Sequence, residues 1–220
     1  MKRPFYENPA VELVARMVDI FLLNVLWVLT SIPVITIGTS TTALYYCMLK
    51  ILRKRDSGVL KMYFDAFFRN LRQGCILTLL LFACSAFLCV DIAGCMMMDS
   101  ALGNGMKLVL IFLLAVLGMV FSYVFPVLAQ FDNSIKGILK SAFFMSLTNL
   151  VRTIPIFLLN VIPFVLFLGY PYGFIVSVPV WLMFGVAVIA LLNSKMLIGI
   201  FDGYIEAAEQ QERGASDDEA

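Results

Sequence analysis

Long apolar runs, separated by short polar and basic segments, make up most of this chain. The run from Asn24 to Lys50 is interrupted at Pro33 and again at Gly38. Proline lacks a backbone N–H and disfavours helical dihedrals at the residue before it, so we interpret this run as parts of two helices joined by a tight turn. A helix needs about 20 apolar residues to cross roughly 30 Å of hydrocarbon. The residues on both sides of the turn supply that length.

The same pattern, followed along the whole chain, predicts an all-α fold: a polytopic membrane helical bundle with six transmembrane helices. The predicted spans cover about 11–32, 36–52, 75–98, 106–131, 153–169 and 174–193. Residues 1–205 are expected to form this single domain, and the acidic residues 206–220 a disordered cytoplasmic tail. Pro155 and Pro163 predict a broken fifth span. Irregular backbone at membrane depth persists where protein or water satisfies it, so this span is a candidate for lining a cavity.

Two amphipathic linker helices are predicted between the spans, at the membrane interface. In the first, apolar residues at helical spacing lie opposite charged ones: Leu60, Phe64, Phe67, Phe68 and Leu71 against Lys61, Asp65, Arg69 and Arg72. In the second, within 132–152, the apolar face is Ile135, Ile138, Leu139, Ala142 and Phe143, opposite Lys136 and Lys140. The candidate contacts to a partner or to lipid are Arg53, Lys54, Arg55, Lys61, Arg69, Arg72, Lys136 and Lys140. Lipid headgroups and a protein partner both remain open, whereas nucleic acid is not expected because the aromatic side chains lie on the buried face.

The distribution of positive charge predicts the topology. With six spans and both termini in the cytoplasm, all of the 16 Lys and Arg residues except Lys107 lie on the inner side, as the positive-inside rule requires. If Asn24 to Lys50 formed a single span, Lys2, Arg3 and Arg16 would lie outside. We therefore expect a multi-pass membrane protein with an even number of spans and both termini in the cytoplasm.

The candidate polar residues inside the predicted spans are Asp19, Asn24, Asp91 and Asn160. Polar and ionisable groups at membrane depth normally face protein or water and mark functional pathways. Asp19 also lies about one helical turn from Arg16, so a structural ion pair is an alternative. Asp91 lies near the end of its span, where local water can solvate it.

The composition excludes much of the familiar enzyme chemistry. Hydrophobic residues make up 61% of the chain, well above the roughly 45–50% of globular proteins. Histidine is absent, which removes His-based triads and metal sites. The five cysteines form no CxxC pair and are interpreted as small buried hydrophobic residues. No phosphate loop, nucleotide fingerprint or nucleophile elbow occurs. We expect no catalytic residue, no metal and no cofactor, and so a protein that is not an enzyme.

Three segments carry a resemblance to a known family. Asn24 to Tyr46 contains N-x-x-W and S-x-P-V-x-T-x-G-x-x-x-x-A, and is followed by YFDAFFRNLRQG and later by FPVLAQFDNSIKGILKSAFFMSL. The combination resembles the YesL-like family of small bacterial integral membrane proteins of unknown function. The resemblance implies no catalytic residue. It does imply an association with carbohydrate uptake, because members are often encoded beside carbohydrate ABC importers and polysaccharide-utilisation enzymes.

Three functions compete at this point. The first is an accessory component of carbohydrate uptake whose basic linkers contact subunits of an ABC importer. The second is an independent small transporter or channel whose path is lined by the intramembrane polar residues and the fifth span. The third is a membrane scaffold or stress factor without a ligand. Importer subunits that dock an ATPase resemble one another through an E-A-A-x-x-x-G signature, and the Asp132-Asn133-Ser134 and Gly137 of this chain do not match it. Neither the ligand nor the oligomeric state follows from the sequence.

Overall fold

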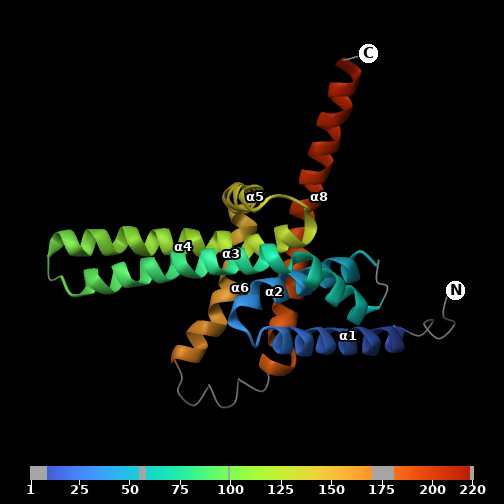
Figure 1. Cartoon of the computed structure of the whole chain (residues 1–220), viewed down its shortest axis with the longest axis horizontal. Helices are drawn as coiled ribbons and strands as arrows, with labels where there is room; N and C mark the ends of the chain where they lie inside the picture. Colours follow the sequence, from blue (N-terminus) through green and yellow to red (C-terminus); the bar gives the residue numbers. More distant parts are fainter. Residues whose placement is uncertain (1–8, 55–57, 99, 170–180, 219–220) are drawn as a thin grey trace.

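The computed structural model of the protein describes residues 9–54, 58–98, 100–169 and 181–218. Within these residues every regular element is helical (Figure 1). In chain order they are α1 (Pro9–Thr30), η1 (Val34–Thr36), α2 (Ile37–Leu52), α3 (Val59–Met96), α4 (Ala101–Gln130), α5 (Ile135–Thr148), α6 (Leu150–Gly169), η2 (Trp181–Gly185) and α8 (Val186–Asp218). The predicted all-α fold is confirmed, as is the helix break at Pro33.

The short helix α2 forms the centre of the molecule and packs against α1, α3, α4 and α8. Its first turns carry small residues, and Ser40, Thr41 and Thr42 each donate a hydroxyl hydrogen bond to the carbonyl four residues earlier. Small residues let helix backbones approach closely, and back-bonded hydroxyls leave no polar group unpaired in the contact. Trp27 Nε1 donates to Thr41 Oγ1 at 3.0 Å and holds α1 against α2.

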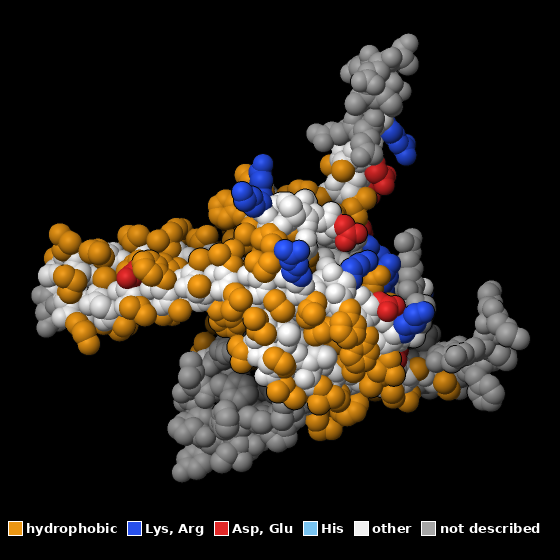
Figure 2. Space-filling view, in the orientation of Figure 1, with side chains coloured by type: hydrophobic (Ala, Val, Ile, Leu, Met, Phe, Trp, Pro, Cys, Tyr) orange, Lys and Arg blue, Asp and Glu red, His pale blue; other side chains and the backbone are white. Residues whose placement is uncertain are grey.

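Helices α3 and α4 form a long antiparallel hairpin that projects beyond the rest of the bundle (Figure 1). The visible face of this projection is almost entirely apolar (Figure 2). Its large exposed side chains include Phe87, Val90, Leu108, Val109 and Phe112. Exposed apolar surface of this extent on two helices is typical of contact with lipid hydrocarbon.

Four described helices are long and apolar enough to cross a membrane: α1, α3, α4 and the segment Met183–Gln210. The pair α5 and α6, bent by 108°, raises this number to five if it is counted as one span. The predicted arrangement of six spans is therefore not confirmed. Helix α2 has 16 residues, or about 24 Å, which is short of the roughly 30 Å of hydrocarbon. The first part of the predicted sixth span, 174–180, lies outside the described residues.

The first predicted linker is not a separate helix, because Val59–Met96 is one continuous α3. Its predicted buried face is also wrong. Met62, Tyr63 and Ala66 are buried together with Phe67, whereas Phe64 and Phe68 are exposed. The reason is that α1 and α2 pack on one side of α3. There the Tyr63 hydroxyl shares a hydrogen bond with Thr30 of α1 at 2.7 Å and donates to the Ser40 carbonyl of α2 at 3.4 Å. The aromatic residues on the other side remain at the surface.

The second predicted linker is present as the separate helix α5. The fifth span differs from its prediction: α6 runs continuously through Pro155 and Pro163, and the chain bends before it, between α5 and α6. The tail predicted to be disordered also differs, because α8 continues to Asp218. Its residues after Tyr204 are mostly good helix formers, so a helix that is already nucleated continues through them. Cys84 and Cys89, predicted to be buried, are exposed on the hairpin.

Candidate functional site

A chain of polar side chains crosses the interior of the bundle. Asn193 of α8 is fully buried and donates to Tyr45 Oη of α2 and to Asn160 Oδ1 of α6, both at 3.1 Å. Asn160 in turn donates to Ser122 Oγ of α4 at 3.1 Å. Four helices are thus linked by one hydrogen-bonded row. Among the described residues, Asn193 Oδ1 and Ser194 Oγ are buried without a hydrogen-bond partner.

The four intramembrane candidates do not share one site. Asn160 belongs to the polar row, and Asn24 is fully buried and accepts a hydrogen bond from the Ala187 amide at 2.9 Å. Ala187 and Asn193 are six residues apart on α8, or about 9 Å, so Asn24 lies near the row. Asp91 lies on the projecting part of α3, half-buried. Asp19 is half-buried on α1, and neither Asp19 nor Arg16 is without a partner.

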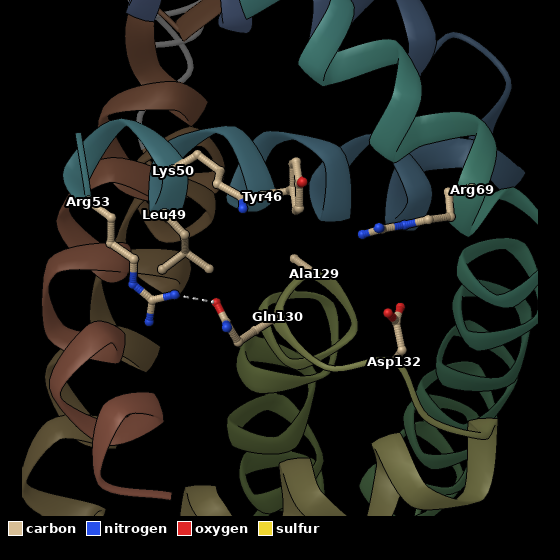
Figure 3. A pocket seen from close by; sticks show the side chains of 8 residues that line it. All are labelled: Tyr46, Leu49, Lys50, Arg53, Arg69, Ala129, Gln130 and Asp132. Carbon is tan, nitrogen blue, oxygen red and sulfur yellow. Dashed lines mark hydrogen bonds between the residues drawn. The ribbon is translucent and has the colours of Figure 1, made fainter. Parts of the chain in front are cut away.

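A second site is a cavity of about 200 Å³ where α2 ends, beside the beginning of α3 and the end of α4 (Figure 3). Tyr46, Lys50 and Arg53 follow one face of α2 because they are four and three residues apart. Arg69 reaches the same space from α3 (Figure 3). The remaining lining residues are Leu49, Ala129, Gln130 and Asp132. Leu49 and Ala129 are buried, so the cavity has an apolar floor beneath charged walls.

The three cations of this cavity are held in different ways. Arg53 donates to Asp202 Oδ1 of α8 at 2.6 Å and to Gln130 Oε1 at 3.2 Å. Lys50 Nζ lies 5.4 Å from the centroid of the Tyr46 ring, and Arg69 Cζ lies 5.3 Å from it. At these distances both cations are attracted by the ring. The ring therefore holds two positive charges close together without neutralising either.

The structure divides the predicted basic residues into two groups. Arg53 and Arg69 line the cavity. Five others, Lys54, Lys61, Arg72, Lys136 and Lys140, are exposed at the surface, and Arg55 lies outside the described residues. The loop before α5 lies beside α3, since Gln73 Nε2 donates to the Asn133 carbonyl at 3.1 Å. The Lys and Arg side chains on the visible face are spread over the body of the molecule and α8, away from the projecting α3–α4 hairpin (Figure 2).

Several residues of both sites are absent from the sequence-based candidates. The cavity adds the polar residues Tyr46, Lys50, Gln130 and Asp132. The polar row adds Tyr45, Ser122 and Asn193. The spacing of Tyr46, Lys50 and Arg53 was a usable signal, because it places an aromatic residue and two cations on one helical face. Asn193 had no such signal in its spacing, since its role depends on hydrogen bonds to residues of two other helices, α2 and α6.

The fold and these sites define an all-helical, multi-pass membrane protein with a cationic cavity at one end. Residues 20–92 match the model of the family described as "Protein of unknown function, DUF624". DUF624 is the YesL-like family, so the resemblance found in the sequence is confirmed over residues 20–92. The match covers the second half of α1, all of α2 and nearly all of α3, including Lys50, Arg53 and Arg69. No curated protein and no solved structure matches the chain.

Proposed function

We propose that this protein is a non-enzymatic accessory component of carbohydrate uptake in a bacterial cell membrane, with both termini in the cytoplasm. The observation that carries the proposal is the exposed basic face formed by Arg72, Lys136 and Lys140 on α3 and α5. The hydrogen bond from Gln73 to the Asn133 carbonyl joins α3 to the loop that leads into α5. The family resemblance, which implies an association with carbohydrate ABC importers, supports the choice of partner.

The basic face suits an acidic protein partner for an electrostatic reason. Its side chains are exposed, and no carboxylate partner of theirs occurs among the residues that the structure describes. Complementary charge across an interface steers association and fixes register more than it adds affinity. We therefore infer an importer subunit or ATPase that presents Asp and Glu side chains to α5.

The test is purification of the tagged protein from native membranes grown on an inducing sugar, followed by identification of the co-purified proteins. Recovery of importer subunits is the expected result. The double variant Lys136→Glu and Lys140→Glu should lose them, because it reverses two charges of the basic face. Lys107→Glu is the matched control, since Lys107 lies at the opposite end of the α3–α4 hairpin. Recovery of no importer subunit by the unaltered protein would contradict the proposal.

A second candidate function, an independent small transporter, is favoured by the buried polar row. Asn193 Oδ1 and Ser194 Oγ lack partners among the described residues, and buried polar atoms of this kind are normally satisfied by water or a ligand. The discriminating experiment is uptake of labelled sugars or ions into vesicles that contain only the purified protein. Uptake that Asn160→Leu abolishes supports transport, whereas absence of uptake leaves the accessory role as the better explanation.

A further inference from the structure

We propose that the cavity at the end of α2 binds the phosphate group of a polyol phosphate ester. No member of the set Tyr46, Lys50, Gln130 and Asp132 has a role in the proposed docking of an importer subunit. The inference therefore goes beyond the proposed function and stands independently of it. The argument rests on the charges that line the cavity, on their partners and on the size of the cavity.

The first step concerns unneutralised charge. Arg53 has a carboxylate partner in Asp202. Lys50 and Arg69 have only the Tyr46 ring, and among the described residues neither lies in an ion pair. Ring attraction leaves the N–H groups of both cations available as donors. Two converging cations with free donors form a site for an anion, and phosphate is an anion that both Lys and Arg commonly bind.

The second step concerns the other wall of the cavity. Gln130 uses its carbonyl oxygen to accept from Arg53, which leaves its NH₂ group for a ligand oxygen. The Asp132 side chain also lines the cavity, on the side where Arg69 enters it (Figure 3). A carboxylate repels a bare phosphate but accepts hydrogen bonds from hydroxyl groups. The ligand is therefore expected to carry hydroxyls beside its phosphate, with the phosphate near Lys50 and Arg69.

The third step concerns size. The cavity of about 200 Å³ is several times the roughly 30 Å³ that one molecule of liquid water occupies. A phosphate ester of a three-carbon polyol fits this space. Such a group occurs in two sources, the headgroup of phosphatidylglycerol and a soluble glycerol phosphate. The cavity lies at the basic end of the bundle, where anionic headgroups are also attracted.

The test uses the purified full-length protein in phosphatidylcholine nanodiscs, with sn-glycerol 3-phosphate as the soluble probe in calorimetry. Phosphatidylglycerol retained by the purified protein is counted by native mass spectrometry as the lipid probe. Saturable calorimetric binding with a dissociation constant below about 1 mM assigns the site to the soluble ester. Specific lipid retention without calorimetric binding assigns it to the headgroup. Binding of neither probe overturns the proposal.

Variants separate the cavity from general surface charge. The double variant Lys50→Gln and Arg69→Gln should weaken binding at least about tenfold, as expected when charge-assisted hydrogen bonds are lost. Lys107→Gln with Lys195→Gln removes the same charge away from the cavity and should change nothing. An equal loss in both pairs overturns the proposal. If the double variant does not fold, the single variant Arg69→Gln tests the site, because it changes an exposed side chain and should weaken binding by itself. Lys50→Arg keeps the positive charge and should retain binding.

Discussion

The close approach of α2 to α3 leads to a quantitative prediction for Gly74. A Cβ atom placed on Gly74 would lie 2.9 Å from the Cα atom of Thr39 and still closer to the Thr39 hydroxyl. The obstacle is the backbone of α2, which moves only if the whole helix moves. Gly94 lies on the same helix, is exposed and has nothing within 4 Å of such a Cβ. The two glycines therefore form a matched pair.

Replacing either glycine by alanine brings the same gain in helix propensity, up to about 1 kcal/mol, so this gain cancels when the two variants are compared. Overpacking costs about 1–3 kcal/mol. Gly74→Ala should consequently be less stable than Gly94→Ala by about 1–3 kcal/mol. The assay is reversible unfolding in mixed micelles with increasing dodecyl sulfate, followed by tryptophan fluorescence and circular dichroism.

A Gly74→Ala variant that is as stable as Gly94→Ala would refute the proposed packing of α2 on α3. Gly38 provides an independent check, because its Cβ would lie 2.6 Å from Phe125 Cζ and also too close to Thr78. Gly38→Ala should therefore also be destabilised, whereas Gly94→Ala should be as stable as the unaltered protein or more stable. This result would show that the beginning of α2 packs tightly against both α3, which carries Thr78, and α4, which carries Phe125.

Three further predictions test other parts of the molecule. Phe68 and Phe87 are both 67% exposed on α3, but only Phe87 lies on the projecting hairpin. Phe87→Lys should therefore impair membrane insertion by about 3 kcal/mol, whereas Phe68→Lys should be tolerated. Glycosylation mapping measures the insertion of both variants, and equal insertion would contradict a lipid-facing hairpin. Asn193→Leu removes two hydrogen bonds of the polar row and should lower the free energy of unfolding by about 1–2 kcal/mol in the same assay. A variant as stable as the unaltered protein would show that the polar row does not stabilise the fold. Asp202→Asn frees Arg53 from its ion pair. This variant should bind sn-glycerol 3-phosphate more tightly in calorimetry, most clearly at low salt. Unchanged or weaker binding would show that Arg53 does not face the ligand. Because this pair is partly exposed, its loss should lower stability by no more than about 1 kcal/mol.

The linker before the third span shows what a periodic pattern leaves undecided. Leu60, Phe64 and Phe68 form an apolar stripe at helical spacing, and the stripe correctly predicts a helix. In water an apolar stripe also identifies the buried face. Next to a membrane it does not, because lipid accepts apolar side chains as readily as a protein core does. The buried face is instead the one with Met62, Tyr63 and Ala66, which fits against α2.

The cationic cavity was predictable only in part. Arg53 and Arg69 stood among the candidates because basic residues gather between apolar segments, and this gathering identifies the polar end of the protein. The partner of Arg53 is Asp202, 149 residues away in the chain. The Tyr46 ring between Lys50 and Arg69 likewise depends on how α2 meets α3. Neither relationship has a signature in local spacing.

The amino-acid sequence alone determined that this protein is helical, that it belongs in a membrane, and that its chain turns at Pro33. These properties follow from local chemistry: apolar run length, the missing N–H of proline and the position of positive charge. Only the tertiary structure decided that the short helix α2 lies at the centre and that three cations meet beside Tyr46. The physical reason is that such arrangements depend on the fit between small residues on neighbouring helices, which brings together groups distant in the chain.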